Sequence, residues 1–150
     1  MQDAEQRESC EQRVRSSFAK QGLMTTLGAA LESVSPGTVE IALYPRADIS
    51  QQHGFVHAGA VSAIADTAAG YAALTLMPAG AGVLTTEFKI NLLAPASGDR
   101  IVAVGKVIKA GRTLTIAQSE VFAENGGQSK LIALLTATLM TLQGKQGVSD

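Results

Sequence analysis

The order of hydrophobic and polar positions divides the chain into a charged start, an alanine-rich centre and a second half of extended runs. Residues 3–20 carry mixed charges, with Val14 and Phe18 four positions apart, which predicts a short amphipathic helix. The central stretch Val56–Met77 repeats apolar residues at helical spacing and stops before Pro78. It predicts a long helix whose small alanines allow another element to pack very close to it.

The remaining pattern is extended. Two short strands are predicted at Thr26–Val34 and Thr38–Tyr44, joined by a Ser-Pro-Gly turn. After the central helix, runs rich in Val, Ile, Leu and Thr alternate with turn signals, and consecutive strands with short turns favour an antiparallel meander. These four runs are Val83–Leu93, Ile101–Lys109, Thr113–Ala123 and Lys130–Leu142. Helix, two strands, long helix and four strands together predict an α+β domain.

One domain accounts for the 150 residues, because a chain of this length holds a single core and no internal repeat is visible. We expect an N-terminal helix or extension over residues 1–20, the folded domain over residues 21–143 and a disordered tail over residues 144–150.

Composition narrows the classes of partner. A net charge of -1 and the absence of Trp argue against a nucleic-acid surface, which needs a basic footprint and stacking rings. Cys10 is the only cysteine, so neither an intrachain disulfide nor a thiolate metal site is predicted. The N-terminus lacks the apolar centre of a signal peptide, and no run reaches the roughly 18 apolar residues of a membrane span. We expect a cytoplasmic protein without nucleic-acid or membrane partners.

The candidate chemistry lies between Gln51 and Asp66. A loop that contains Gly and His leads into the N-terminus of the predicted helix, where unpaired N–H groups and the positive end of the macrodipole gather. The small residues Ala58 and Gly59 allow a ligand to approach the backbone closely. Such a place stabilises a carbonyl oxygen that gains negative charge in a tetrahedral intermediate.

Asp66 is a carboxylate inside an alanine-rich helix, where burial is costly unless water, a partner or a substrate meets it. It is therefore the candidate catalytic carboxylate, and the alternative is that it points to solvent. Ala58 and Asp66 are eight residues apart, about 12 Å along one helix. Both cannot reach one reacting carbonyl from the same helix. If both are catalytic, two subunits share the site, which implies a homodimer.

These features resemble those of the PaaI-like (phenylacetate-degradation-type) hotdog-fold acyl-CoA thioesterases over residues 20–142. The resemblance is carried by His57-x-Gly59, by an Asp nine residues after that His, and by the strand 85–96 that ends in Pro-Ala before Gly-Asp. It implies a hotdog fold, in which a six-stranded antiparallel sheet wraps around a long central helix. It also implies homodimers that pair into homotetramers, and hydrolysis of acyl-CoA without metal or cofactor.

The resemblance also implies roles for individual residues. The Ala58 N–H would polarise the thioester carbonyl, and Asp66 of the facing subunit would act as general base or nucleophile. Thr85 matches a hydroxyl residue that orients the attacking water, and Gln51 falls where related enzymes carry Asn near the thioester. The chain departs from the pattern at two of these positions, since Ala58 replaces Gly and Gln51 replaces Asn.

The remaining candidates have structural alternatives. We expect His57 to orient the loop through a bond between its ring and the backbone, because two histidines without a second carboxylate nearby make a poor metal site. His53 is either a rim residue of the loop or a substrate contact. Lys109, Gly111 and Arg112 form a hairpin tip that is either a solvated turn or a contact to the phosphates of coenzyme A.

The function predicted is hydrolysis of an aryl- or medium-chain acyl-CoA to the free acid and coenzyme A. Two alternatives stay open. A hotdog dehydratase acting on hydroxyacyl thioesters would set a His base against a separate acid, whereas the spacing of His57 and Asp66 fits the thioesterase pattern better. A non-catalytic acyl-CoA-binding module would have no need of a carboxylate beside the thioester.

Overall fold

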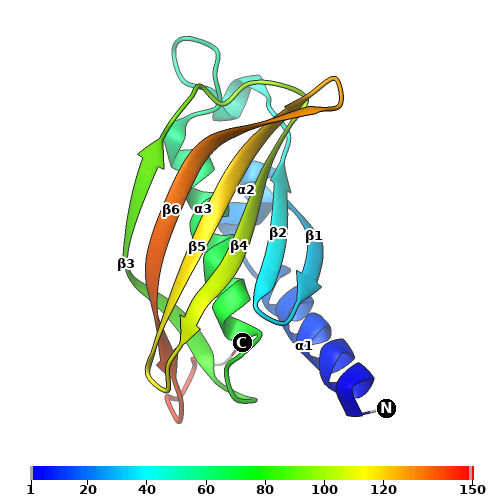
Figure 1. Cartoon of the computed structure of the whole chain (residues 1–150), viewed down its shortest axis with the longest axis vertical. Helices are drawn as coiled ribbons and strands as arrows, with labels where there is room; N and C mark the ends of the chain where they lie inside the picture. Colours follow the sequence, from blue (N-terminus) through cyan, green and yellow to red (C-terminus); the bar gives the residue numbers. More distant parts are fainter. Residues whose placement is uncertain (1, 149) are drawn as a thin grey trace.

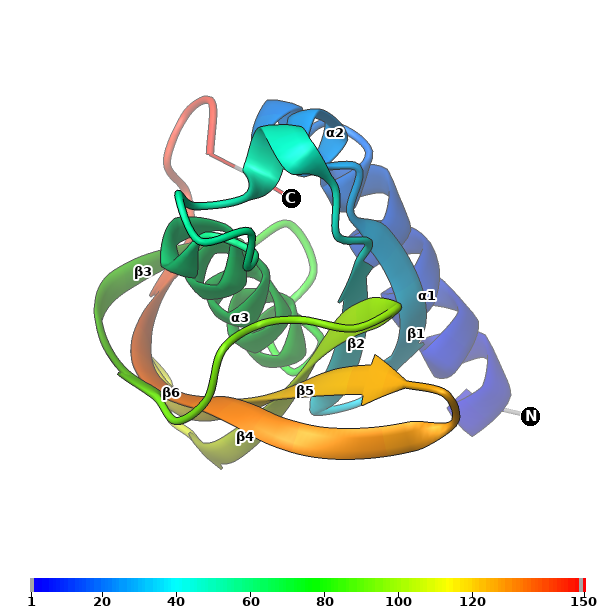
Figure 2. The same cartoon turned by 90° about the horizontal axis from the view of Figure 1, so that it is seen from above.

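The alanine-rich centre of the chain forms helix α3 (Ala58–Leu74), and a six-stranded antiparallel sheet curves around it (Figures 1 and 2). The computed structural model describes residues 2–148 and 150, with side chains from residue 9 onward. Met1 and Ser149, which belong to the predicted N-terminal extension and the predicted tail, lie outside the described residues. The other elements are α1 (Gln2–Phe18), α2 (Gly22–Leu27), β1 (Ala30–Ser35), β2 (Thr38–Leu43), η1 (Ala47–Ile49), β3 (Gly82–Leu92), β4 (Arg100–Ala110), β5 (Leu114–Asn125) and β6 (Gln128–Leu142).

The strand order is β1-β2-β4-β5-β6-β3, which confirms the α+β hotdog arrangement and corrects one detail of it. Strands β4, β5 and β6 form the predicted meander, but β3 lies beyond β6 at the far edge of the sheet. Residues 93–99 therefore cross the end of the sheet instead of forming a hairpin (Figure 2). Local turn signals cannot distinguish a hairpin from such a crossover, because the choice depends on which strand covers which side of α3.

The close approach of helix and sheet depends on a glycine of β4. A Cβ atom at Gly105 would lie 2.3 Å from the carbonyl carbon and oxygen of Ala68, so the position excludes every side chain. Ala68 and Ala69 are fully buried against it. The prediction that the alanines allow very close packing is thereby confirmed.

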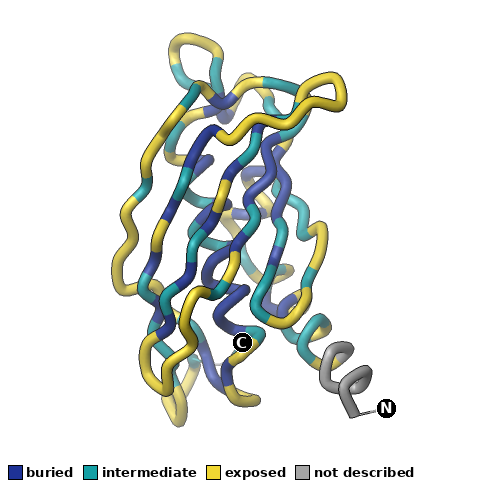
Figure 3. Tube along the Cα trace, viewed as in Figure 1, coloured by how far each residue is buried: buried dark blue, intermediate teal, exposed yellow. Residues whose placement is uncertain are grey.

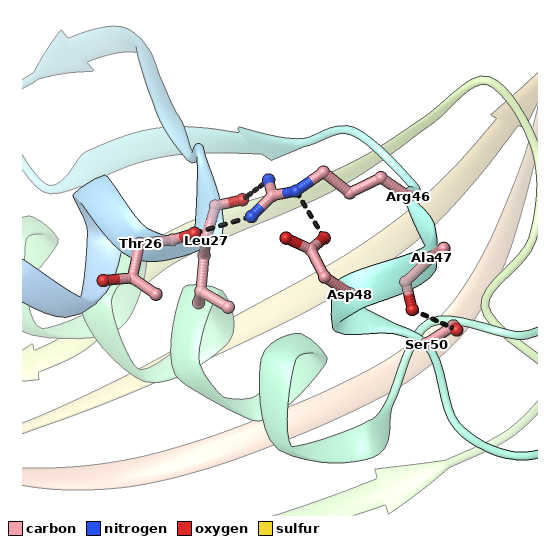
Figure 4. Close-up of polar contacts among 6 residues, drawn as sticks. All are labelled: Thr26, Leu27, Arg46, Ala47, Asp48 and Ser50. Atoms are coloured by element: carbon pink, nitrogen blue, oxygen red, sulfur yellow. Dashed lines mark hydrogen bonds and ion pairs between the residues drawn. The ribbon is translucent and has the colours of Figure 1, made fainter.

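The short helix α2 was not predicted, and the strand expected from Thr26 begins only at Ala30. Arg46 caps this helix, because its Nη1 and Nη2 each donate at 2.6 Å, to the carbonyls of Leu27 and Thr26 (Figure 4). Gly28 ends α2 with φ 68°, and a Cβ there would lie 2.7 Å from Arg46 Nη1. The cap comes from a distant segment, so the local pattern did not reveal the helix.

The remaining predicted elements begin and end within a few residues of the observed ones. None of the helices among the described residues is long and apolar enough to cross a membrane. After β6, residues 143–148 form no regular element, and Asp150 accepts hydrogen bonds from Ser17 and from the Val83 N–H. The disorder of residues 144–150 in solution stays a prediction.

Candidate active site

Asp66 lies on the half-exposed face of α3 and is bonded to strand β3. The Thr85 hydroxyl donates to Asp66 Oδ1 over 2.8 Å. The ladder between β3 and β6 shifts register between Thr85 and Glu87, and such a bulge re-aims side chains locally. A cavity of about 240 Å³ opens beside the pair and is lined by Gln21, Leu23, Ala63, Asp66, Thr67, Gly70, Tyr71, Val83 and Thr85.

The environment of Asp66 sets its acid–base character. Burial raises the pKa of the Asp66 carboxyl above its usual range, and the hydrogen bond from Thr85 opposes this by lowering it. The net direction is upward, which makes the carboxylate a stronger base than an exposed aspartate.

His57 caps the N-terminus of α3. Its Nδ1 accepts from the Gly59 N–H at 2.8 Å, and its carbonyl accepts from the N–H groups of Ala60 at 2.9 Å and Val61 at 3.2 Å. Among residues 2–148 and 150, no acceptor bonds to the Ala58 N–H. Of the amides in the first turn, that of Ala58 is therefore left for a ligand. The cap also explains Gly59, since a Cβ there would lie 3.0 Å from His57 Nδ1.

Ala58 faces a different cavity from that of Asp66. This second cavity has a volume of about 470 Å³ and is mostly apolar; its lining consists of Gln51, Phe55, Val56, Ala58, Val61, Leu92, Leu93, Ala94, Pro95, Ala96 and Ile132. The Gln51 side-chain oxygen accepts from the His53 N–H, which leaves the amide NH₂ as the group available to a ligand. The two cavities have no lining residue in common, so one chain does not bring Asp66 and Ala58 to one cavity.

The other predicted substrate contacts lie outside both cavities. His53 is exposed in the loop before α3. Lys109, Gly111 and Arg112 are exposed at the β4–β5 hairpin, at the opposite end of the molecule from that loop (Figure 1). A Cβ at Gly111 would lie 2.3 Å from the Leu114 carbonyl oxygen, so the hairpin itself requires this glycine.

Sequence reasoning missed several residues that wall the Asp66 cavity. The Tyr71 hydroxyl accepts from Gln21 Nε2 at 2.9 Å, and Leu23 and Val83 complete that side. Tyr71 follows Asp66 by five positions in an alanine-rich helix. A large aromatic residue among alanines was the sequence signal that could have identified it. Gln21 and Leu23 had none, because their place depends on α2. Within the described part of the chain, no three His, Cys, Asp or Glu side chains gather as metal ligands.

The chain is similar to known proteins in sequence and in fold. The family model described as the thioesterase superfamily matches residues 53–130. A thioesterase family protein of Silicibacter pomeroyi is 49% identical, with a TM-score of 0.88 over 90% of this chain and 99% of that one. The phenylacetic acid degradation protein PaaI of Thermus thermophilus, solved as a mutant, is 28% identical, with a TM-score of 0.72 over 81% of this chain and all of that one.

Two further likenesses extend the picture. The PaaI protein of Escherichia coli shares the fold at 22% identity, with a TM-score of 0.83 over 92% of this chain and 96% of that one. A protein of Halobacterium salinarum named as a candidate esterase is 30% identical over 105 residues, which are 67% of this chain and 69% of that protein.

The chain thus belongs to the thioesterase superfamily and is a thioester hydrolase. Its predicted resemblance to the PaaI-like hotdog branch is confirmed. This outcome favours the thioester hydrolase over the two alternatives left open by the sequence, the dehydratase and the binding module.

Proposed function

We propose that this thioesterase hydrolyses acyl-CoA in a site shared by two copies of the chain, with Asp66 from one copy and the Ala58 amide from the other. The observation that carries the proposal is the separation of the two groups. The unpaired Ala58 N–H and the Thr85–Asp66 pair open into different cavities of the same chain. Each cavity therefore holds one of the two groups that the proposed hydrolysis needs, either the N–H donor or the carboxylate.

The exposed strand β3 supports a second copy as the missing half. Phe88 and Leu92 pair with the buried Ala137 and Ala133, so they lie on the inner face of the sheet. Yet they are 46% and 54% exposed, in a strand that is exposed along most of its length (Figure 3). An edge strand with free backbone groups and apolar side chains is a template for pairing. A second copy added to β3 would cover these side chains with its own helix.

Two-fold symmetry would complete the site. Antiparallel pairing of β3 with its copy reverses the partner's helix, so the Ala58 end of one α3 turns toward the middle of the other. The same reversal turns the β4–β5 hairpin of one copy toward the Gln51 loop of its partner. We therefore keep Lys109 and Arg112 as proposed contacts to the phosphates of coenzyme A. Pairing of such dimers into tetramers, and a cytoplasmic location, stay predictions.

The chemistry follows from the two halves. The thioester oxygen accepts from the Ala58 N–H of one copy, while the Gln51 amide helps to hold the thioester. Because Thr85 occupies one oxygen of Asp66, the other oxygen is left to hold a water. Asp66 removes a proton as this water attacks the carbonyl carbon. The tetrahedral intermediate then expels the coenzyme A thiolate, which takes up the proton.

The substrate class proposed is an aryl- or medium-chain acyl-CoA. The Asp66 cavity, about 240 Å³ in one chain, is one half of the proposed shared site. The cavity that Ala58 lines is larger and mostly apolar.

A thiol-release assay over a panel of acyl-CoAs tests the proposal. We expect turnover by the wild type and a loss of about 10²-fold or more in kcat for Asp66→Asn, since a positioned base contributes on that scale. Asp99→Asn is the matched control, because Asp99 is an exposed carboxylate in the loop before β4. Equal activity of Asp66→Asn and the control would refute the role of Asp66.

A further inference from the structure

A chain of hydrogen bonds that the proposed chemistry does not use connects the wall of the Asp66 cavity to Asp150. Gln21 Nε2 donates to the Tyr71 hydroxyl at 2.9 Å, and the Tyr71 and Ser17 hydroxyls lie 3.0 Å apart. The Ser17 hydroxyl donates to Asp150 Oδ1 at 2.8 Å, and Asp150 Oδ2 accepts from the Val83 N–H at 2.9 Å. A single carboxylate therefore links α1, α3 and β3.

The direction of each bond is fixed by proton count. Ser17 has one hydroxyl proton and gives it to Asp150, so it accepts from the Tyr71 hydroxyl. Tyr71 has then donated its own proton and accepts from the Gln21 amide. Each hydrogen bond is therefore donated in the direction from Gln21 to the carboxylate of Asp150. This direction also requires that the NH₂ end of the Gln21 amide faces Tyr71.

Burial explains why the hydroxyls of Ser17 and Tyr71 are hydrogen-bonded. It does not explain which elements this series of hydrogen bonds connects. Ser17 and Tyr71 are almost fully buried, and unpaired hydroxyls there would be costly. These hydrogen bonds, however, connect the two elements that form the Thr85–Asp66 bond, through Tyr71 on α3 and Val83 on β3. Val83 precedes Thr85 by two positions on β3, and Tyr71 follows Asp66 by five positions on α3, about 7.5 Å along the axis.

The start of β3 is held on its outer side by the C-terminal segment, next to Ala81, whose carbonyl accepts from Arg13 Nη2 at 2.8 Å. Strand β3 is at the edge of the sheet, and the Val83 N–H is bonded to Asp150 instead of to β6. Val148 lies directly against this point, since a Cβ at Gly82 would be 2.8 Å from Val148 Cγ1. Val148 and Asp150 thus contact the first two residues of this edge strand, Gly82 and Val83.

We propose that Asp150 is a positioning residue of the active site. By joining the start of β3 to Tyr71 of α3, its carboxylate fixes the spacing at which the Thr85 hydroxyl meets Asp66. This inference rests on the proposed function for its effect on catalysis, but its effect on Asp66 itself can be measured without substrate.

Loss of the link has a definite consequence for Asp66. When Thr85 moves away, the hydrogen bond that lowers the pKa of Asp66 weakens, and the effect of burial remains. The pKa of Asp66 then rises further, so the carboxylate becomes protonated at a higher pH. The ionisable groups around this link are Tyr71 in the cavity wall, Asp150 behind it, and Arg13 of α1, whose charge interacts with that of Asp150.

The test compares Asp150→Ala and Asp150→Asn with the control Asp99→Ala, which also removes a carboxylate that accepts a backbone N–H, that of Gly126 in a distant loop. Carbon-13 NMR of the full chain, with the Asp66 signal assigned from Asp66→Asn, follows the titration of Asp66. We expect an upward pKa shift in Asp150→Ala, a smaller one in Asp150→Asn, whose amide oxygen still accepts from Val83, and no shift in the control.

Kinetics with one acyl-CoA gives the second readout. For Asp150→Ala we expect kcat to fall about tenfold, in line with the cost of a small displacement at a reacting centre, with a smaller change in KM. The acid limb of the rate profile should move to higher pH. An unchanged Asp66 titration in Asp150→Ala would overturn the inference, even if the variant melts earlier. If Asp150→Ala shows the upward pKa shift of Asp66 but the wild type releases no thiol, the proposed function is refuted and the positioning role of Asp150 stands.

Discussion

Strands β3 and β4 have the same length, and comparing them separates the residues that build the fold from those that carry the chemistry. Strand β4 lies between β2 and β5, and its inner face packs against α3 through Gly105. Strand β3 lies at the edge, exposed on both faces along most of its length (Figure 3). Its Thr85 bonds the candidate catalytic carboxylate. Substitutions in β4 should therefore affect stability, and those in β3 should affect assembly and turnover.

The largest effect is expected in β4. Gly105→Ala would place a Cβ atom against backbone atoms of Ala68, which cannot rotate away. Overpacking of this kind costs typically 1–3 kcal/mol and sometimes more, and we expect about 3 kcal/mol or a failure to fold. Urea unfolding measures it, with Gly22→Ala as the control because no atom lies within 4 Å of a Cβ there. A Gly105→Ala variant as stable as the control would contradict the close packing.

The next effect is on assembly through β3. Phe88→Arg puts a charge on the face that the second copy is proposed to cover, so we expect dissociation to monomers together with loss of turnover. Leu76→Arg is the matched control, since Leu76 is also 46% exposed but lies just after the C-terminal end of α3, outside both β3 and the β4–β5 hairpin. Light scattering of both variants measures the mass. A monomeric wild type with full activity would refute the shared site.

A smaller effect is expected from Thr85→Val, which keeps the shape of the side chain but removes the hydrogen bond to Asp66. Because this bond lowers the pKa of Asp66, its loss should move the acid limb of the rate profile to higher pH. We expect kcat to fall about tenfold, which corresponds to about 1.4 kcal/mol. A pH–rate profile with one acyl-CoA checks both, and Thr86→Val serves as the neighbouring control on the same strand. An acid limb at the wild-type pH would mean that Thr85 does not act on Asp66.

The smallest effect is a gain in stability. Because the pKa of Asp66 is raised in the folded state, folding favours its protonated form, and ionisation destabilises the fold as the pH rises through that pKa. Asp66→Asn should therefore melt above the wild type at pH 7, and the difference should vanish under acidic conditions where the wild-type carboxyl is neutral. Thermal melts across pH measure the difference. A gap that grows on acidification would reverse the sign assigned to the shift in the pKa of Asp66.

The local pattern of hydrophobic and turn residues predicted the elements that depend mainly on neighbouring residues in the sequence. Helix α3 and strands β4–β6 follow from periodicity and turn residues, and Asp66 stood out as a charge in an alanine-rich helix. The place of β3 beside β6 and the helix α2 depend on contacts distant in sequence, such as that of Arg46 with the end of α2. A bond between the His57 ring and the backbone was predicted and is present, but its role as the N-cap of α3 was not predicted, because Ser, Thr, Asp and Asn are the usual N-caps.

The shared site is the central claim, and mixing two inactive variants tests it most directly. Ala58→Pro removes the proposed N–H donor at the first position of α3, where proline is well tolerated, and His57 already has the extended backbone that precedes proline (ψ 138°). Asp66→Asn removes the base. Each variant alone should be nearly inactive.

After unfolding and refolding together in equal amounts, half of the dimers would be mixed, and each of these would contain one intact site. The account predicts recovery to about a quarter of wild-type activity, because about one site in four is intact. Activity that stays at the level of the separate variants, although the mixed dimers form, would contradict a site built from two chains.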